Sequence, residues 1–514
     1  MHFFTFIFIV AAFLLTLKSI KQYVGLRRFR GPRGAGWSRL WMLRVLTSGR
    51  MHKYFGEVNE EYGSTARIAP STLLTKDVSL IRRMSAVRSP YTRSKVYEAL
   101  RLHPERDNIV SYRDEAIHGQ LRTKMSPGYS GKDNPNLEME IEEQILNLIA
   151  LIERSYTSDS ERYNPVDLAR IMTFFTLDVI SGIAFGRPFG FLTDNSDPFG
   201  YLQNLRMMLP AIMFFSVYPE LLGILRLPAV QYFFPKASDA TGVGKVMGWA
   251  KESVAARFGP NKIEQKDMLG SFLAHGLTQE ELESETLTQI TAGSDSTSTA
   301  LRLALMHIFT HQGPCSKLLE ELTNGLKDGK ISRPIIRDSE ARELPYLQAC
   351  IKESLRLYPP VTGMLSKNVP PEGDTIDGIF VPGGTSIAWN SWGMCHEKSL
   401  YGDDPYVFRP ERWLLHDKAS PDDEARLQAM NDTVWMVFGY GRFGCLGRPV
   451  AMMELNKTIA EFVLRFDCRA GGGLEKMWDE ESFGFFLHRN MWMRIEKRDD
   501  KLVWGKDKFH AQVE

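Results

Sequence analysis

Cysteine is scarce in this sequence of 514 residues. The five cysteines are an odd number, lie far apart, and include no C-x-x-C pair. Unpaired cysteines in a chain of this size are typical of a reducing compartment, because disulfide-stabilised secreted domains are short and carry cysteines in even numbers. We therefore expect free thiols, four of which are ordinary core residues: Cys315, Cys350, Cys395 and Cys468.

An excess of one charge sign is also lacking. The 63 basic and 62 acidic residues are interspersed and leave a net charge of +1. Without a basic block, the sequence has no electrostatic footprint for nucleic acid. Low-complexity segments are absent too, and no linker divides the chain after residue 60. One large domain is therefore expected, although the length alone would suggest two or three.

A long apolar run opens the chain. Residues 2–17 are almost wholly apolar, and six basic residues follow: Lys18, Lys21, Arg27, Arg28, Arg30 and Arg33. One alternative is a cleaved signal peptide, but no Lys or Arg precedes the run and no small-x-small cleavage site follows it. Another is a helix that lies in the membrane interface. The basic flank favours an uncleaved anchor over residues 1–20 with the rest of the chain in the cytosol, because basic residues stay on that side.

Residues 21–50 are expected to form a basic linker, in which residues 31–34 (Gly-Pro-Arg-Gly) turn the chain away from the bilayer as a hinge. Beyond the linker, helical spacing dominates, most clearly in residues 137–155 and 166–185. Strand-like segments are sparse and short: residues 64–68, 375–380 and 385–388. The sequence therefore predicts a mainly α protein with a small β region.

Residues 206–235 are unusually apolar. Core packing is the ordinary reason for such a segment. The alternative is a substrate entrance that lies against the membrane, since large exposed apolar patches mark such contacts.

A long helix is predicted between Thr278 and His311, because Thr278 and Glu281 have the spacing of a capping box. Residues 292–297 (Ala-Gly-Ser-Asp-Ser-Thr) lie near its middle. Glycine and hydroxyl side chains weaken a helix, since hydroxyl groups compete for the backbone. We therefore expect the helix to open locally there and to leave a groove and free carbonyl groups for a ligand.

A second helix is predicted after Pro345, a residue that suits the first helical turn. Glu353 and Arg356 are three residues apart and share one face of that helix. An exposed ion pair is the ordinary interpretation of this spacing. Residues 408–413 (Phe-Arg-Pro-Glu-Arg-Trp) would bring a second guanidinium group to it.

Cys445 follows the glycine-rich residues 438–444 and precedes a helical pattern that runs through Leu464. Glycine lets backbone N–H groups approach the sulfur, and these donors and the helix dipole favour the thiolate over the thiol. A buried, inert cysteine is the alternative.

Taken in order, the motif at residues 292–297, the E-x-x-R pair and the cysteine loop resemble the cytochrome P-450 family of haem-thiolate monooxygenases. The resemblance covers roughly residues 30–495, and the forms "FGYGR..CLG" and "PPVTG" are similar to the fungal pisatin demethylase-like members. It implies the cytochrome P-450 fold, with one haem-thiolate catalytic domain over residues 51–514. It also implies haem b as the cofactor, with the Cys445 thiolate as axial iron ligand.

The same resemblance assigns roles to further residues. A buried ion cluster would shape the cysteine loop: Glu353, Arg356 and Arg412. Haem propionates would be bound by four residues: His118, Arg122, Lys367 and Arg442. The usual basic position two before the cysteine holds Phe443, and Arg442 is displaced by one, a shift typical of the fungal subgroup.

Asp295 and Ser296 match the acid–alcohol pair that delivers protons to iron-bound oxygen in this family. Serine stands where threonine is more frequent, and Thr297 follows as a third catalytic candidate. The substrate pocket is expected to draw on five segments: residues 103–117 and 206–235, the helix around Ala292, and residues 361–365 and 482–487. Phe483, Phe485 and Phe486 would make it apolar and aromatic.

The implied activity is a monooxygenase that uses O2 to oxidise a lipophilic small molecule, in secondary-metabolite biosynthesis. The sequence has no G-x-G-x-x-G after a strand and no flavin or iron–sulfur signature. Electrons are therefore expected from a separate NADPH-cytochrome P-450 reductase, and the anchor implies the endoplasmic reticulum membrane. Two alternatives are a haem-thiolate enzyme that does not oxygenate, or uses peroxide, and a non-catalytic haem- or sterol-binding membrane protein. The intact Asp295–Ser296 pair argues against both.

Overall fold

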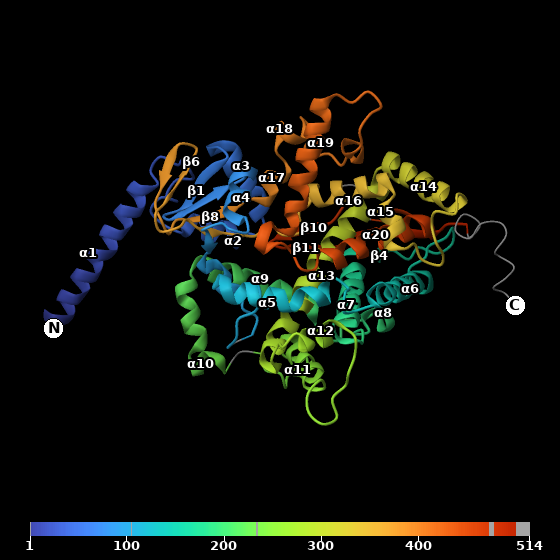
Figure 1. Cartoon of the computed structure of the whole chain (residues 1–514), viewed down its shortest axis with the longest axis horizontal. Helices are drawn as coiled ribbons and strands as arrows, with labels where there is room; N and C mark the ends of the chain where they lie inside the picture. Colours follow the sequence, from blue (N-terminus) through green and yellow to red (C-terminus); the bar gives the residue numbers. More distant parts are fainter. Residues whose placement is uncertain (1, 104, 233–234, 472–476, 500–514) are drawn as a thin grey trace.

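The computed structural model describes residues 2–103, 105–232, 235–471 and 477–499. Helices form most of it (Figure 1). The longer helices are α1 (His2–Gly25), α3 (Met51–Tyr62), α5 (Glu115–Tyr129), α6 (Leu137–Ser155), α7 (Leu168–Phe185), α9 (Tyr201–Val217), α11 (Gly242–Ala255), α13 (Gln279–Thr310), α14 (Gln312–Lys327), α16 (Pro345–Leu357), α19 (Pro421–Val434) and α20 (Arg448–Arg465). The shorter ones are α2 (Leu40–Leu46), α4 (Val78–Ser85), α8 (Phe191–Asp194), α10 (Pro228–Gln231), α12 (Met268–Ala274), α15 (Asp338–Arg342), α17 (Ser391–Cys395) and α18 (Lys398–Tyr401). Short 3₁₀ helices are η1 (Lys95–Leu100), η2 (Pro219–Arg226), η3 (Pro410–Trp413), η4 (Trp435–Phe438) and η5 (Gly441–Phe443).

The strands form small sheets at the edges of the helical body. The largest has the order β1-β2-β8-β5-β3, with strands β1 (Thr65–Ala69), β2 (Thr72–Thr75), β8 (Ser386–Trp389), β5 (Lys367–Asn368) and β3 (Thr92–Arg93). A second joins β4 (Val166–Asp167), β12 (Trp492–Lys497) and β9 (Phe466–Ala470). Two hairpins complete the set, β6 (Asp374–Ile376) with β7 (Ile379–Val381), and β10 (Asp479–Ser482) with β11 (Phe486–Arg489). The prediction of a mainly α protein with a small β region is confirmed.

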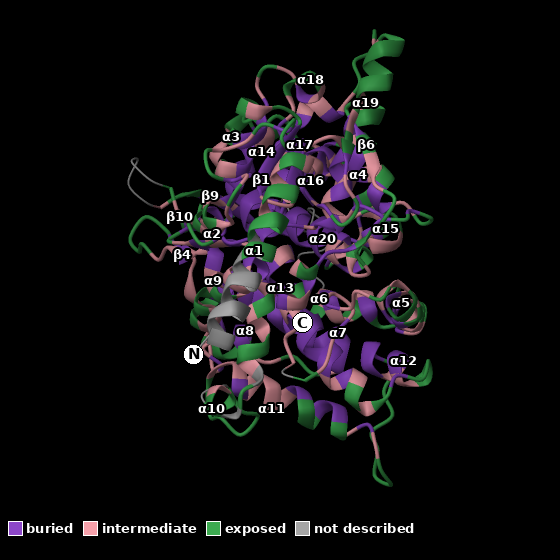
Figure 2. Cartoon of the chain, turned by 90° about the vertical axis from the view of Figure 1, so that its left-hand side faces the viewer, coloured by how far each residue is buried: buried purple, intermediate pink, exposed green. Residues whose placement is uncertain are grey.

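Helix α13 is the centre of the body, and it packs along α7, α16 and α20. Figure 2 shows buried residues concentrated on these helices and exposed residues on peripheral ones such as α19. Outside residues 2–12 and 15, whose side chains the structure does not describe, one helical segment is long and apolar enough to cross a membrane: Leu168–Phe185, which is α7. It is 94% buried inside the protein, as expected of a core helix.

Local signals in the sequence located the main helices. The capping box of α13 forms, with Thr278 Oγ1 accepting from the Glu281 N–H at 3.2 Å. Pro345 is the first residue of α16. The expected local opening at residues 292–297 is wrong, because α13 is continuous from Gln279 to Thr310. The hydroxyl groups there accept no backbone donor; those of Ser294 and Ser296 instead donate to carbonyl oxygens four residues earlier.

Helix α1 projects from the body in Figure 1. Its base is held by the buried Arg67 of β1, which donates to the carbonyl oxygens of Gln22 and Tyr23 at 3.0 and 3.1 Å. Gly31, in the predicted hinge, lies so close to this strand that an added Cβ would come within 1.9 Å of the Arg67 carbonyl oxygen. The segment that follows α1 is therefore packed against the sheet.

Candidate active site

Cys445 lies in the loop between η5 and α20. Its N–H donates to the Phe438 carbonyl oxygen at 2.6 Å, which closes the loop. Gly439 and Gly441 have φ angles of 81° and 58°, which other residues rarely adopt. A Cβ at Gly441 would also come within 2.3 Å of the Ser85 carbonyl oxygen. Both glycines are therefore needed for the backbone path that presents the sulfur.

The Cys445 side chain faces an internal cavity, so it is exposed to that space although the protein surrounds it. Burial raises the pKa of the thiol, and the N–H groups of Gly447 and Arg448 and the Arg122 guanidinium lower it by less. The predicted donors are thus present, but they do not make a thiolate on their own. A coordinated metal ion would, because it deprotonates a thiol outright.

The cavity has a volume of about 350 Å³. Cys445 and residues of the cysteine loop form one wall, and Ala292, Gly293, Ser296 and Thr297 of α13 form another. Among the cysteines in the described part of the chain, Cys445 alone lines it. An added Cβ at Gly293 would come within 2.8 Å of the Ile180 side chain, so glycine at this position lets α13 pack closely on α7.

Basic side chains gather at one end of the cavity. His118 and Arg122 of α5 line it, together with Arg93 of β3. Arg93 Nη2 lies 2.8 Å from His118 Nε2, and Arg122 donates to the Gly444 carbonyl oxygen of the cysteine loop. Lys367 and Arg442 are not part of the lining: they lie behind Phe443, whose ring centroid is 2.8 Å from Lys367 Nζ. Arg442 donates to the Tyr91 carbonyl oxygen at 2.9 Å.

These cations outnumber the acids around them. One carboxylate, that of Glu115, faces four permanent or potential cations: Arg93, Arg122, Lys367 and Arg442. Lys367 Nζ is buried and has no hydrogen-bond partner among the residues that the structure describes. Burial together with Arg93 lowers the pKa of Lys367 to about 6. Burial and the same cations lower the pKa of His118 to about 3. Buried charge of one sign is costly without a partner, so this end of the cavity fits an anionic group such as the propionates of haem.

Asp295 lies on α13 one residue before Ser296, but its carboxylate does not line the cavity. It turns toward α9, where Tyr201 Oη donates to Asp295 Oδ2 at 3.0 Å. Burial raises the pKa of Asp295 to about 6, although Arg302 and the Tyr201 hydrogen bond act to lower it. A carboxyl group with such a pKa can take up and release a proton near neutral pH.

Comparison with known proteins decides the family. The sequence matches the Cytochrome P450 family over residues 31–491. It is 40% identical over 506 residues to Cytochrome P450 monooxygenase ABA1 of Pyricularia oryzae, which covers 97% of each chain. It is 35% identical over 468 residues to Cytochrome P450 monooxygenase aba1 of Botryotinia fuckeliana, and the match covers 90% of each chain. It is 34% identical over 447 residues to Cytochrome P450 monooxygenase abl1 of Leptosphaeria maculans, and the match covers 86% of this chain and 77% of that relative. The chain belongs to the cytochrome P450 family.

As a cytochrome P450, the protein is a haem-thiolate monooxygenase, and its cofactor is haem whose iron is bound by a cysteine thiolate. Cys445 would supply that thiolate, because it is the cysteine of the described residues that lines the cavity. The cavity fits this cofactor, because it places one cysteine sulfur on a wall and an excess of buried cations at one end.

The E-x-x-R pair of this P450 is fully buried and is joined by a second arginine. Glu353 Oε1 accepts from Arg356 Nη2 at 2.8 Å and from Arg412 Nε at 2.9 Å. The other oxygen of Glu353 accepts from Trp413 Nε1 at 2.9 Å. Arg356 also donates to the carbonyl oxygens of Cys395 and Pro405, at 3.0 and 2.6 Å. The structure thus brings Glu353, Arg356 and Arg412 together and ties α16 to the segment that leads to the cysteine loop.

A second buried network links α13 to the β10–β11 hairpin. Arg302 Nε donates to His488 Nδ1 at 2.9 Å, and Arg302 Nη2 donates to the Phe486 carbonyl oxygen at 3.0 Å. Since His488 accepts at Nδ1, its proton is on Nε2, which lies 3.6 Å from Glu480 Oε2. Glu480 Oε1 in turn lies 3.1 Å from His52 Nε2. The turn of this hairpin brings Gly484 and Phe485 into the cavity wall, so Arg302 holds a substrate-facing turn in place.

Replacing Arg302 by methionine is therefore expected to loosen the hairpin while leaving Cys445 in place. Hydrogen bonds to a charged donor contribute about 1.5–3 kcal/mol, so amide hydrogen exchange in residues 479–489 should speed up by about 10–100-fold. Arg489→Met is the control, because it removes a partly exposed arginine of the same hairpin that pairs with Glu481 at 3.3 Å and donates no hydrogen bond to α13 among the described residues. Equal exchange rates in both variants would show that Arg302 does not hold the turn.

Three of these residues were missed from the sequence. Arg93 and Tyr201 carry no local signal, because neither lies in a motif and their partners are distant in sequence. Arg302 stands two turns after Asp295 on α13, and a basic residue inside an otherwise apolar helical segment was a signal that could have found it.

Proposed function

We propose that this cytochrome P450 inserts one atom of O2 into a lipophilic small molecule in a secondary-metabolite pathway. The observation that supports this most strongly is the cavity with Cys445 on one wall and Ser296 and Thr297 on the wall formed by α13. When bound there, a thiolate-ligated haem supplies the activation of O2. Every other task falls to side chains of the protein.

Arg93, His118 and Arg122 are proposed to bind the haem propionates, since they line the basic end of the cavity. Lys367 and Arg442 lie behind Phe443 and are proposed to contribute through their charge. The proposed task of Glu353, Arg356 and Arg412 is to fix the backbone that leads to the cysteine loop.

Asp295, Ser296 and Thr297 are proposed to deliver protons into the cavity. Ser296 and Thr297 present hydroxyl groups at its wall. Asp295 is the titratable group beside them, and Tyr201 holds its carboxyl group away from the cavity. A proton would pass from Asp295 to a hydroxyl group after the carboxyl group turns inward, a rotation that breaks the bond to Tyr201.

Asp295→Asn is expected to lower product formation by about 10²–10⁴-fold, the usual contribution of a positioned proton donor, and to retain haem. The donating form of Asp295 exists below its pKa of about 6 and is lost as the pH rises through it. Product formation by the wild-type enzyme should therefore slow as the pH rises over that range, and product formation by the Asn variant should not.

A double variant, Ser296→Ala with Thr297→Ala, should consume NADPH with release of peroxide. Wild-type rates and coupling in both variants would contradict the role.

The substrate pocket draws on all five predicted segments, through residues such as Ile109, Met213, Val361 and Phe485. Phe483 and Phe486 do not line it, because they are buried against other parts of the protein. The mainly apolar lining supports a lipophilic substrate.

Helix α1 is proposed to anchor the protein in the endoplasmic reticulum membrane, with the catalytic domain in the cytosol. Its 24 residues give a length of about 36 Å, enough for the hydrocarbon core of a bilayer. Exposed apolar residues on nearby segments support a second membrane contact: Trp37, Leu40, Met207, Ile224, Leu227 and Tyr232. Figure 1 shows α1 and α10 on the same side of the protein.

Deleting residues 2–24 is expected to move most of the protein from the membrane fraction to the supernatant, with haem content unchanged. The measurement is cell fractionation with haem quantified in each fraction. If the truncated protein stays with membranes as fully as the intact one, the α9–α10 face is the anchor instead of α1.

The electron donor is proposed to be a membrane-bound NADPH-cytochrome P450 reductase. Arg448, at the start of the helix that follows the cysteine loop, is an exposed basic residue, and such a charge suits an acidic partner. Metabolite profiling of a strain that lacks this protein tests the function, because the precursor that accumulates is the substrate or close to it. Purified enzyme, reductase, NADPH and isotopically heavy O2 should then convert that precursor to a product that carries the heavy atom. Conversion without the heavy atom would contradict oxygenation.

A further inference from the structure

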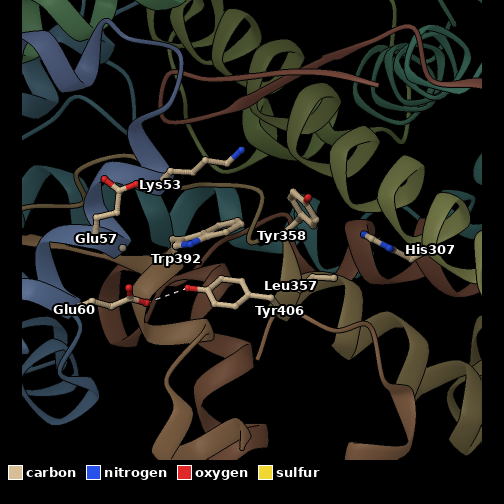
Figure 3. A pocket seen from close by; sticks show the side chains of 9 residues that line it. Lys53, Glu57, Glu60, His307, Leu357, Tyr358, Trp392 and Tyr406 are labelled. Atoms are coloured by element: carbon tan, nitrogen blue, oxygen red, sulfur yellow. Dashed lines mark hydrogen bonds between the residues drawn. The ribbon is translucent and has the colours of Figure 1, made fainter. Parts of the chain in front are cut away.

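A second pocket lies between α3, α13, α16 and α17 (Figure 3). Its volume is about 380 Å³. It shares no lining residue with the haem cavity, and the proposed reaction makes no use of it.

Aromatic rings form its walls. Trp392 stacks on His396 at a centroid distance of 4.2 Å, and His396 stacks on Tyr406 at 4.6 Å. Tyr358 meets the edge of Trp392 at 5.7 Å. A Cβ at Gly56 would lie 3.1 Å from the Trp392 ring, so glycine lets α3 approach this wall closely. Trp392 is a buried residue of this wall, with 8% of its surface exposed.

The rim of the pocket is acidic. Glu57 and Glu60 are exposed residues one turn apart on α3, and Figure 3 shows both beside Tyr406 and Trp392. Tyr406 Oη donates to Glu60 Oε1 at 3.2 Å, and Glu57 has no ion pair among the described residues. Lys53, the one basic residue in the lining, lies 3.5 Å from Glu480 and is partly neutralised by it. The charge at the rim therefore favours a cation.

The deep end of the pocket is formed by His307 of α13. The side chain is buried, and neither ring nitrogen has a hydrogen-bond partner among the described residues. Burial and neighbouring cations lower its pKa to about 3, so the ring is neutral at pH 7. It stacks on Phe408 at a centroid distance of 5.2 Å. The deep end of the pocket is therefore uncharged, and it contains the ring nitrogens of His307, which lack hydrogen-bond partners among the described residues.

We propose that this pocket binds an organic cation, with its ammonium head between Glu57, Glu60 and the aromatic walls and its apolar body directed toward His307. Aromatic faces attract an ammonium group through their electron-rich π surface, and carboxylates strengthen the attraction. A cation of this kind would be a second ligand of the enzyme, separate from the substrate that is oxidised.

Binding of benzyltrimethylammonium to the purified holoenzyme by isothermal titration calorimetry tests the proposal. Its quaternary nitrogen has no lone pair and cannot ligate haem iron, so the haem absorption spectrum should not change. Saturable binding is expected for the cation and not for neopentylbenzene, its neutral carbon isostere. The absence of saturable binding by the cation, or equal binding of the isostere, would overturn the proposal.

The double variant Glu57→Gln with Glu60→Gln should weaken binding of the cation by about 10-fold or more. Tyr406→Ala should weaken it as well, and this residue is 51% exposed, so its loss leaves the core intact. Glu61→Gln is the control for loss of a carboxylate from the same helix, since Glu61 lies outside the pocket lining, although it removes one charge where the double variant removes two. If the double variant binds as tightly as Glu61→Gln, or if binding shifts the haem spectrum, the cation binds elsewhere and the proposal is wrong.

Discussion

Cys445→Ser is expected to abolish oxygenation and to remove the thiolate signature from the absorption spectrum of the reduced, CO-bound enzyme. Serine has nearly the same size, so the loop held by the Cys445 N–H and the Phe438 carbonyl oxygen should keep its path. A thiol releases its proton when it binds iron, whereas the serine hydroxyl group stays protonated. The hydroxyl group therefore does not supply the electron density that a thiolate gives to the iron. Product formation should fall below detection.

Cys315→Ser is the matched control for this variant, because Cys315 is half-buried and lies outside the cavity. It should keep both the spectrum and the activity. A Cys445→Ser protein that oxygenates at the wild-type rate would contradict the assignment of the iron ligand.

Glu353→Gln is expected to prevent accumulation of folded, haem-containing protein. Glu353 is fully buried and balances the charges of Arg356 and Arg412. Removing the carboxylate leaves the buried Arg356 guanidinium without a counter-ion among the described residues, and leaves Arg412 with Asp404 alone, at 3.5 Å. Breaking a buried ion pair in this way costs about 3–5 kcal/mol. That is a large part of the free energy of unfolding of a typical domain. The measurement is the yield of haem protein and the midpoint of its thermal unfolding.

Glu320→Gln on α14 is the control, because this carboxylate is exposed and removal of an exposed charge changes stability little. If Glu353→Gln yields as much haem protein as the control, with the same unfolding midpoint, the ion cluster does not maintain the haem site.

The parts of the fold that local patterns encode could be predicted. The capping box at Thr278 and the proline at position 345 set the starts of α13 and α16 within one residue, because cap hydrogen bonds involve neighbours in sequence. The apolar periodicity of residues 137–155 gave α6 its full length. The hairpins were harder to predict from local patterns. Residues 375–380, expected as one strand-like segment, belong to two strands that are joined by a turn at Asp377 and Gly378, both of which have positive φ.

Sites that arise from distant segments could not be predicted from residue patterns alone. The partners Arg93 and His118 are 25 residues apart, and Tyr201 and Asp295 are 94 apart. The cysteine loop could be located because glycine and cysteine occur there in one short segment. Whether Cys445 is a thiolate or a thiol could not be predicted, since the burial that raises the pKa of Cys445 is a property of the whole fold. The hydroxyl groups of residues 294–296 were misjudged because such groups either weaken a helix or bond its carbonyl oxygens, and the packing of α13 on α7 decides which.

The most direct test of the central claim is iron K-edge X-ray absorption spectroscopy of the purified ferric enzyme, which identifies the atoms bound to iron. The structure predicts one sulfur neighbour, contributed by Cys445, because no other cysteine in the described part of the chain lines the cavity. The Cys315→Ser enzyme should give the same spectrum. An iron whose neighbours are all nitrogen and oxygen would contradict the account.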